Sequence, residues 1–276
     1  MTFENRSDSN FQALRASRPR AFVALVLITA LALLGACGGP RRTAVQNGPD
    51  DSPSPSEKPQ AVQPKAPDKP EEPVKPQWTK RCVITTGVHG NEPSGYLVQD
   101  QLTELGFVTF GPCNPWGIEN NKREMQDGRD LNRFFQDDSI PQVKAVWDFL
   151  AANKPDLLLD LHEDPTNPPG PYLIQNGPKD DLGERIIQAL GSDYTWHPNP
   201  AWGPIKGKNG LIKPTTQLLA WQKQFKVFSL GAYAYFTFGV TTFTVEVPGN
   251  WDMEKKKAYQ LKVCQTAREI FEARTK

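Results

Sequence analysis

Four side chains in this sequence are of types that can bind a metal ion and activate water. His89 and Glu92 lie three residues apart in the segment HGNE, just after a short β-branched run. His162 follows a strongly apolar run, and Glu246 lies near the end of another β-branched run. Two imidazoles and a carboxylate suit zinc with one position left open, and a further carboxylate can move a proton. The residue types therefore indicate a metal site of the catalytic kind.

These side chains must be positioned by an alternation of strands and helices between residues 78 and 276. The expected strands are 81–87, 107–111, 155–161 and 241–247. The expected helices are 93–105, 139–153 with Ser139 as its N-cap, 180–191 and 252–274, and the tract 192–236 is expected to form loops over the site. The alternation predicts an α/β fold, a three-layer α/β/α sandwich with a mixed but mostly parallel sheet.

The candidate residues lie where such a sheet collects its ligands. In open α/β sheets, ligands bind at the carboxyl ends of the strands. His89 and Glu92 follow the first expected strand, His162 follows the third, and Glu246 is near the end of the last. In TTFTVEV, alternation places Thr244 and Glu246 on the same face. We therefore expect the four chemical side chains to meet at one edge of the sheet.

Further motifs lie between the two histidines. The segment 114–117 reads NPWG, Arg123 precedes the arginine of DLNR (130–133) by ten residues, and LH closes the apolar run at 161–162. With HGNE and the late-strand glutamate, these ordered pieces span residues 83 to 248. Here the chain resembles the zinc carboxypeptidase superfamily. That superfamily includes digestive carboxypeptidases, murein peptide amidases and the succinylglutamate desuccinylase/aspartoacylase branch.

The resemblance implies a role for each matching residue at the metal. His89, Glu92 and His162 would be the ligands of one zinc ion. Asp130 would orient His89, because the second ring nitrogen of a ligating histidine needs an acceptor.

The resemblance also implies the residues that act on substrate. Glu246 would be the general base, and Arg123 would stabilise the oxyanion, a role for which the neighbouring Arg129 competes. Asn132 and Arg133 would hold a substrate carboxylate, which a planar guanidinium can bind through two parallel hydrogen bonds.

For three features, the sequence does not decide which residues form the substrate pocket. Digestive carboxypeptidases carry a mobile tyrosine about two dozen residues before the base, whereas Tyr233 and Tyr235 lie much closer to Glu246. Whether either tyrosine closes over substrate is not decided by the sequence. Glu163 and Asp164 are expected to be ordinary loop acids, with substrate contact as the alternative. The third histidine, His197, is expected in a loop outside the metal site.

The N-terminus resembles that of an exported bacterial lipoprotein. The stretch 21–34 carries no charge and follows Arg15, Arg18 and Arg20. It is shorter than the about 20 residues that a transmembrane helix needs, and its length suits the apolar region of a signal peptide. The following LGAC resembles a lipobox, so residues 1–37 are expected to be a signal peptide and Cys37 the lipidated residue. The residue after Cys37 is Gly and not Asp, which favours the outer membrane over the inner one. The catalytic domain is expected to face the periplasm.

Composition places a linker after this signal. Ten of the 26 prolines lie between residues 40 and 76, among polar and charged residues, so 38–77 is expected to be a disordered linker and 78–276 the catalytic domain. The net charge of +1 gives no sign of nucleic-acid binding, and nothing indicates a protein partner. Cys82, Cys113 and Cys264 allow one disulfide in an oxidising compartment, without indicating the pair.

The sequence supports three functions. The first is a zinc carboxypeptidase or amidase that cuts peptides beside a free carboxylate, most plausibly peptidoglycan stem peptides, since an export signal requires a substrate outside the cytoplasm. The second is an N-acyl amino acid deacylase, which would bind the carboxylate of its substrate through the same residues. The third is a non-catalytic zinc-binding lipoprotein, against which the intact set of candidate residues argues.

Overall fold

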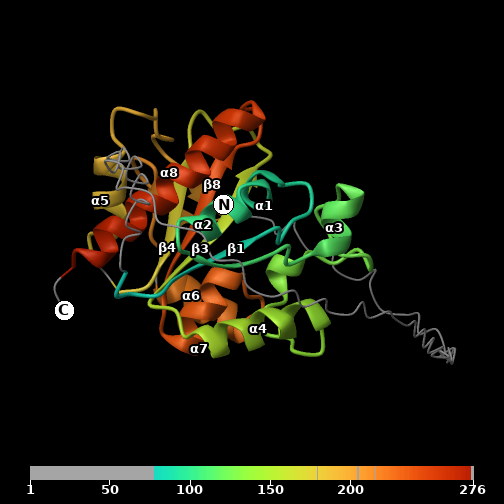
Figure 1. The fold of residues 1–276 in the computed structure, drawn as a ribbon. Coiled ribbons are helices and arrows are strands. Elements are labelled where there is room, and N and C mark those ends of the chain that lie inside the picture. Colours follow the sequence, from blue (N-terminus) through green and yellow to red (C-terminus); the bar gives the residue numbers. More distant parts are fainter. Residues whose placement is uncertain (1–77, 179, 204, 215, 275–276) are drawn as a thin grey trace, which may run out of the picture. The chain divides into compact units, whose positions relative to one another are not determined.

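A computed structural model describes residues 78–178, 180–203, 205–214 and 216–274 (Figure 1). They belong to one compact unit, Lys69–Lys276. The expected signal peptide (1–37), the lipidation site Cys37 and the linker (38–77) lie outside the described residues. Within the described part of the chain, no helix combines the length and the apolar character that crossing a membrane requires.

A six-stranded sheet runs through the domain. Its strands are β1 (Cys82–Thr86), β2 (Val108–Phe110), β3 (Leu157–Asp164), β4 (Tyr172–Asn176), β7 (Leu211–Ile212) and β8 (Thr241–Pro248), in the order β2-β1-β3-β8-β4-β7. All neighbouring pairs are parallel except β8 and β4, which are antiparallel. A separate two-stranded sheet joins β5 (Ala201–Trp202) to β6 (Ile205–Lys206). The predicted α/β class with a mixed, mostly parallel sheet is confirmed.

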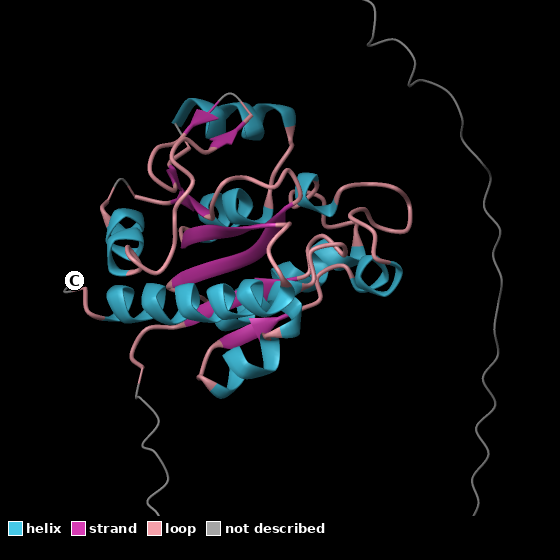
Figure 2. Cartoon of the chain, turned by 90° about the horizontal axis from the view of Figure 1, so that it is seen from above, coloured by secondary structure: helices cyan, strands magenta, loops and turns pink. Residues whose placement is uncertain are grey.

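Helices cover both faces of the large sheet. They are α1 (Ser94–Leu97), α2 (Gln99–Glu104), α3 (Pro115–Asn120), α4 (Pro141–Asn153), α5 (Leu182–Ala189), α6 (Thr216–Phe225), α7 (Leu230–Phe238) and α8 (Met253–Glu272), with a short 3₁₀ turn, η1 (Leu131–Arg133). Figure 1 shows α5 and α8 on one side of the strands and α4, α6 and α7 on the other. In Figure 2 the long helix that ends at the C label, α8, runs alongside the strands.

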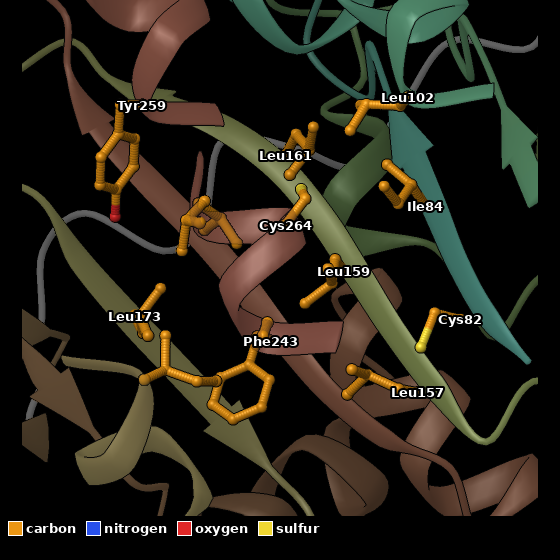
Figure 3. Packing of buried hydrophobic residues seen from close by; sticks show 14 of the residues in the cluster. Cys82, Ile84, Leu102, Leu157, Leu159, Leu161, Leu173, Phe243, Tyr259 and Cys264 are labelled. Carbon is orange, nitrogen blue, oxygen red and sulfur yellow. The ribbon is translucent and has the colours of Figure 1, made fainter. Parts of the chain in front are cut away.

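Each face of the sheet carries its own apolar core because strand side chains alternate. Leu157, Leu159 and Leu161 of β3 pack towards α8 (Figure 3), whereas Leu158 packs with the helices on the opposite face. Seven of the eight β3 residues are buried, as expected for a central strand covered on both faces. The apolar run of the sequence thus predicted the strand that carries a metal-ligand candidate.

The structure corrects several expected boundaries. The expectation that 192–236 forms only loops was wrong, since this tract contains three short strands, the helix α6 and most of α7. Ser139 does not cap α4; its hydroxyl donates to Asp137, and Ile140 occupies the N-cap. The third strand continues to Asp164, so Glu163 is a strand residue and the expectation of a loop acid was wrong.

The three cysteines expected to supply any disulfide are all free and buried.

Candidate metal centre

The first loop of the site is held by close backbone packing. The HGNE segment follows β1, and a Cβ atom on Gly90 would lie 1.8 Å from the backbone carbonyl carbon of Gly117. Only glycine fits at this contact. The side chain of Asn114 caps α3 by accepting from the Gly117 backbone N–H at 3.1 Å, and its amide donates to the Glu124 carbonyl at 3.0 Å. The NPWG motif therefore packs against HGNE and fixes the loop that carries His89.

The other side chains come from a row across the sheet. His162 of β3 is the register partner of Glu246 in β8, and Glu246 is in turn the partner of Tyr172 in β4. Register partners on neighbouring strands point to the same face, with Cβ atoms about 5 Å apart. The sheet thus places the metal-ligand candidate, the acid and an aromatic ring side by side.

Three ligand atoms converge at this edge. The Nδ1 atom of His89 lies 2.8 Å from Oε1 of Glu92, and the Nδ1 atom of His162 lies 2.8 Å from Oε2 of the same carboxylate. One ligand atom from each of the three residues falls within 4.8 Å of the others, and all three residues are buried. Among the described residues, this is the group of histidine, cysteine and acid side chains that could hold a metal ion.

Each imidazole is also held from its far side. Nε2 of His89 lies 3.0 Å from Oδ1 of Asp130, and Nε2 of His162 lies 2.9 Å from Oδ2 of Asp160. Asp130 is the partner that the resemblance implied, whereas sequence reasoning missed Asp160. The signal for Asp160 was the spacing Asp-x-His in a strand, which puts both side chains on one face. Thr85 donates its hydroxyl to the other oxygen of Asp160 at 2.8 Å.

The donor pattern fits a metal cation. A neutral imidazole carries one N–H, and an aspartate at Nε2 accepts it. The two Nδ1 lone pairs then face the Glu92 carboxylate. A proton on an imidazole or a metal cation can occupy this position, and two imidazole nitrogens with a carboxylate are the ligands of open zinc sites.

The charges at the centre shift the pKa values of its groups. Burial raises the pKa of Glu92, but the imidazoles of His162 and His89 outweigh burial and hold it below its ordinary value. Burial lowers the pKa of His162, but the carboxylates of Asp160 and Glu92 outweigh it and raise that pKa well above its ordinary value. Burial raises the pKa of Glu246 to about 8, a rise that the nearby His162 opposes.

A cavity opens beside the metal-ligand candidates, and Arg123 lines it, whereas Arg129 does not. The Arg123 guanidinium donates to Oε1 of Glu92 at 2.9 Å and to Oδ2 of Asp130 at 3.2 Å. Arg129 pairs instead with the exposed Asp127. Of the two arginines weighed for the oxyanion role, the structure brings Arg123 to the metal ligands.

Asn132 and Arg133 reach the cavity from η1. The Asn132 oxygen accepts from the Leu230 backbone N–H at 2.8 Å, which fixes the side chain and leaves its amide N–H groups for other partners. The Arg133 guanidinium donates to the Asn132 carbonyl, and its nearest described carboxylate, Asp130, is 4.0 Å away. A half-exposed guanidinium without a close counter-ion can bind an incoming carboxylate.

The cavity between these groups has a volume of about 340 Å³. Tyr172 and Trp202 line it, and Tyr172 was not identified as a site residue from the sequence. The Tyr172 hydroxyl donates to Asp164 at 2.7 Å. Tyr233 and Tyr235 are absent from the lining, and Tyr233 stacks on Trp147 with ring centroids 4.8 Å apart. In this conformation, the aromatic ring beside Glu246 is therefore that of Tyr172.

No protein-family model matches the chain, and no curated protein matches it. Solved structures do match. A Shewanella amazonensis protein, provisionally assigned as a metallopeptidase, matches 73% of this chain and 81% of its own at TM-score 0.57 and 16% identity. A Shewanella denitrificans protein with the same provisional assignment matches 69% of this chain and 73% of its own at TM-score 0.54 and 19% identity.

A third match is Csd4 from Helicobacter pylori, described as a D,L-carboxypeptidase and solved in an mDAP-bound form. It covers 69% of this chain and 50% of its own chain at TM-score 0.50 and 16% identity. At these identities the likeness shows the fold alone, and that fold is shared with proteins provisionally assigned as metallopeptidases. The fold that the sequence predicted is confirmed at that level.

Proposed function

We propose that this protein is a zinc-dependent hydrolase that cuts an amide bond next to a free carboxylate. One observation carries the proposal. The Nδ1 atoms of His89 and His162 converge on Glu92, and Glu246 is the direct register partner of His162. A metal-ligand set and a carboxylate beside it are the two parts that water activation requires.

Zinc bound there would polarise the scissile carbonyl and make its water ligand more acidic. The chain's own residues do the rest. Asp130 and Asp160 hold the Nε2–H tautomer of each imidazole, which leaves the Nδ1 lone pairs for the metal. Glu246 takes the proton of the attacking water and later delivers it to the leaving nitrogen. Burial raises the pKa of Glu246 in the metal-free protein, whereas the charge of a bound Zn²⁺ would favour its carboxylate form, which is the form that accepts a proton.

Arg123 and Arg133 have separate roles in the proposal. Arg123 uses two of its five N–H donors on Glu92 and Asp130 and can direct others to the oxygen on which charge develops. Arg133, with the Asn132 amide, would bind the substrate carboxylate, because the nearest described carboxylate, Asp130, is 4.0 Å from its guanidinium and leaves donors free for an incoming anion.

Peptides of the cell envelope are the proposed substrates. The match to Csd4, which is described as a D,L-carboxypeptidase and was solved with mDAP bound, supports this class, as does the predicted export signal. One part of the cavity lining is uncharged and consists of Ile174, Asn176, Ser229 and Thr244. Without a counter-charge there, we expect an uncharged side chain on the terminal residue of the substrate to be preferred.

The test compares the zinc-loaded protein with its Glu246→Gln variant on murein stem peptides and N-acyl amino acids, with products identified by mass spectrometry. We expect the wild type to release a terminal residue or peptide. The variant should keep zinc and lose about 10²- to 10⁴-fold in turnover, since it cannot accept a proton. A variant with near-normal turnover would remove Glu246 from the mechanism.

The same mixture distinguishes the alternatives. Release of acyl groups alone would make the protein an N-acyl amino acid deacylase. Bound zinc without any product would indicate another substrate or a non-catalytic binding role.

The location is a separate part of the proposal. Lipidation of Cys37 would anchor the chain to a membrane, preferably the outer membrane, with the hydrolase domain in the periplasm. Incorporation of radiolabelled palmitate into the wild type, and its loss in Cys37→Ser, would support this. Equal labelling of both would refute it.

A further inference from the structure

A buried ion pair lies directly behind the metal-ligand candidates. Glu163 follows His162 in β3, and its Oε2 accepts from the Lys256 ammonium of α8 at 2.5 Å. The two side chains are 5% and 8% exposed. Taking both charges out of water costs several kcal/mol per ion, and a pair of apolar residues would commonly stabilise the fold as well or better. Stability alone therefore does not explain this pair.

Glu163 connects three segments of the site. Its Oε1 accepts from the Ser94 backbone N–H at 2.7 Å, which ties β3 to the start of α1 just after Glu92. Its own backbone N–H donates to Oε2 of Glu92 at 3.1 Å. The same Glu92 oxygen lies 2.8 Å from Nδ1 of His162. Lys256 thus holds the residue that orients the carboxylate of the metal-ligand set.

A second contact from α8 reaches the same strand. Gln260 lies one turn after Lys256, so both side chains project from one face of the helix. Its amide Nε2–H donates to the backbone carbonyl of His162 at 3.1 Å. Gln260 is fully buried, and its Oε1 has no hydrogen-bond partner among the described residues. An unpartnered buried oxygen destabilises a fold, so this residue too is not explained by stability.

We infer that Lys256 and Gln260 are positioning residues, through which α8 fixes Glu92 and His162 in the geometry that binds the metal ion. This inference rests on the metal binding in the proposed function. Lys256 acts on Glu92 through Glu163, and Gln260 acts on the backbone of His162. Neither touches the site where substrate would react.

Substituting Lys256 separates positioning from electrostatics. Removing a cation makes the surroundings of the metal more negative, and by Coulomb's law alone the affinity for Zn²⁺ should rise. If Lys256 positions Glu92 through Glu163, the affinity should fall instead. The two explanations predict opposite signs for one substitution.

The experiment measures Zn²⁺ affinity of the full chain by competition with a chromophoric chelator. It compares the wild type, Lys256→Met, Gln260→Met and the control Lys257→Met. Lys257 is the next residue of α8, and its partner is the exposed Glu254 at 3.0 Å. We expect Lys256→Met and Gln260→Met to bind Zn²⁺ about tenfold more weakly, the lower end of the effect of removing groups that orient ligands. Lys257→Met should bind like the wild type.

Thermal unfolding of the metal-free proteins gives the second readout. Gln260→Met removes the unpartnered oxygen together with the hydrogen bond to the His162 carbonyl, so the two effects oppose each other and the midpoint should change little. A fall in Zn²⁺ affinity at a nearly unchanged midpoint is a result that a purely structural role would not produce. If Lys256→Met fails to fold, Gln260→Met decides. Folded variants that bind Zn²⁺ as tightly as the wild type, or more tightly, would overturn the inference. If the wild type itself binds no Zn²⁺, the proposed function has failed, not the assignment of α8.

Discussion

Asp160 offers a sharp test of the metal centre. It is fully buried, its Oδ2 lies 2.9 Å from Nε2 of His162, and its Oδ1 accepts from the Thr85 hydroxyl at 2.8 Å. In Asp160→Asn, the amide oxygen can keep the bond from Thr85, and the amide NH₂ then faces Nε2. The ring proton must move to Nδ1, the atom that would bind zinc.

The size of the effect follows from the bond that is lost. A hydrogen bond to a charged group contributes about 1.5–3 kcal/mol, and each 1.4 kcal/mol is tenfold in affinity. We therefore expect Asp160→Asn to weaken Zn²⁺ binding about 10- to 100-fold. Asp130→Asn should weaken it less, because the Asp130 side chain is 22% exposed and water can replace part of the interaction with His89.

Competition with a chromophoric chelator at fixed pH and ionic strength measures both affinities. The exposed Asp148, which pairs with Lys144 on α4, supplies the control Asp148→Asn. Thermal unfolding of the metal-free proteins checks that each variant folds. Zn²⁺ affinity within twofold of the wild type for Asp160→Asn, or a larger loss in Asp130→Asn, would refute the role given to the buried aspartate.

Three further predictions concern stability and substrate binding. Between the ordinary pKa of 4.5 and the raised value of about 8, the folded metal-free protein keeps a proton on Glu246 that the unfolded chain releases, so this group makes stability fall as pH rises. Glu246→Gln should reduce that slope in urea unfolding at pH 5 and pH 8 with chelator present; an unchanged slope would contradict the raised pKa. Zinc at 100 times its Kd should stabilise the protein by about 2.7 kcal/mol, or roughly 5–10 °C in thermal midpoint, and excess chelator should abolish the shift. Arg133→Lys should raise KM about tenfold with little change in kcat, because lysine cannot bind a carboxylate through two parallel bonds; an unchanged KM in steady-state assays would place the carboxylate elsewhere.

Local patterns in the sequence predicted the elements that carry the candidate site. The apolar run before His162 became the central strand β3, and the alternation in TTFTVEV put Thr244 and Glu246 on the cavity side with Phe243 and Val245 in a core. These features depend on residues close in sequence, where alternation and burial act directly.

The tract 192–236 was not predictable in the same way. Its strands β5, β6 and β7 are two residues long, and such short segments carry no periodic signal. The strand β7 exists because it pairs with β4, and β4 itself pairs antiparallel to β8. Partners far apart in the chain determine these elements.

By itself, the sequence determined the fold class and the candidate metal ligands, because strand ends and short motifs such as HGNE are local. Only the tertiary structure brought Tyr172 beside Glu246 and Lys256 onto Glu163. Both contacts join residues that are distant in the chain, and strand register or helix packing decides whether they meet. Spacing in the sequence carries no information about either.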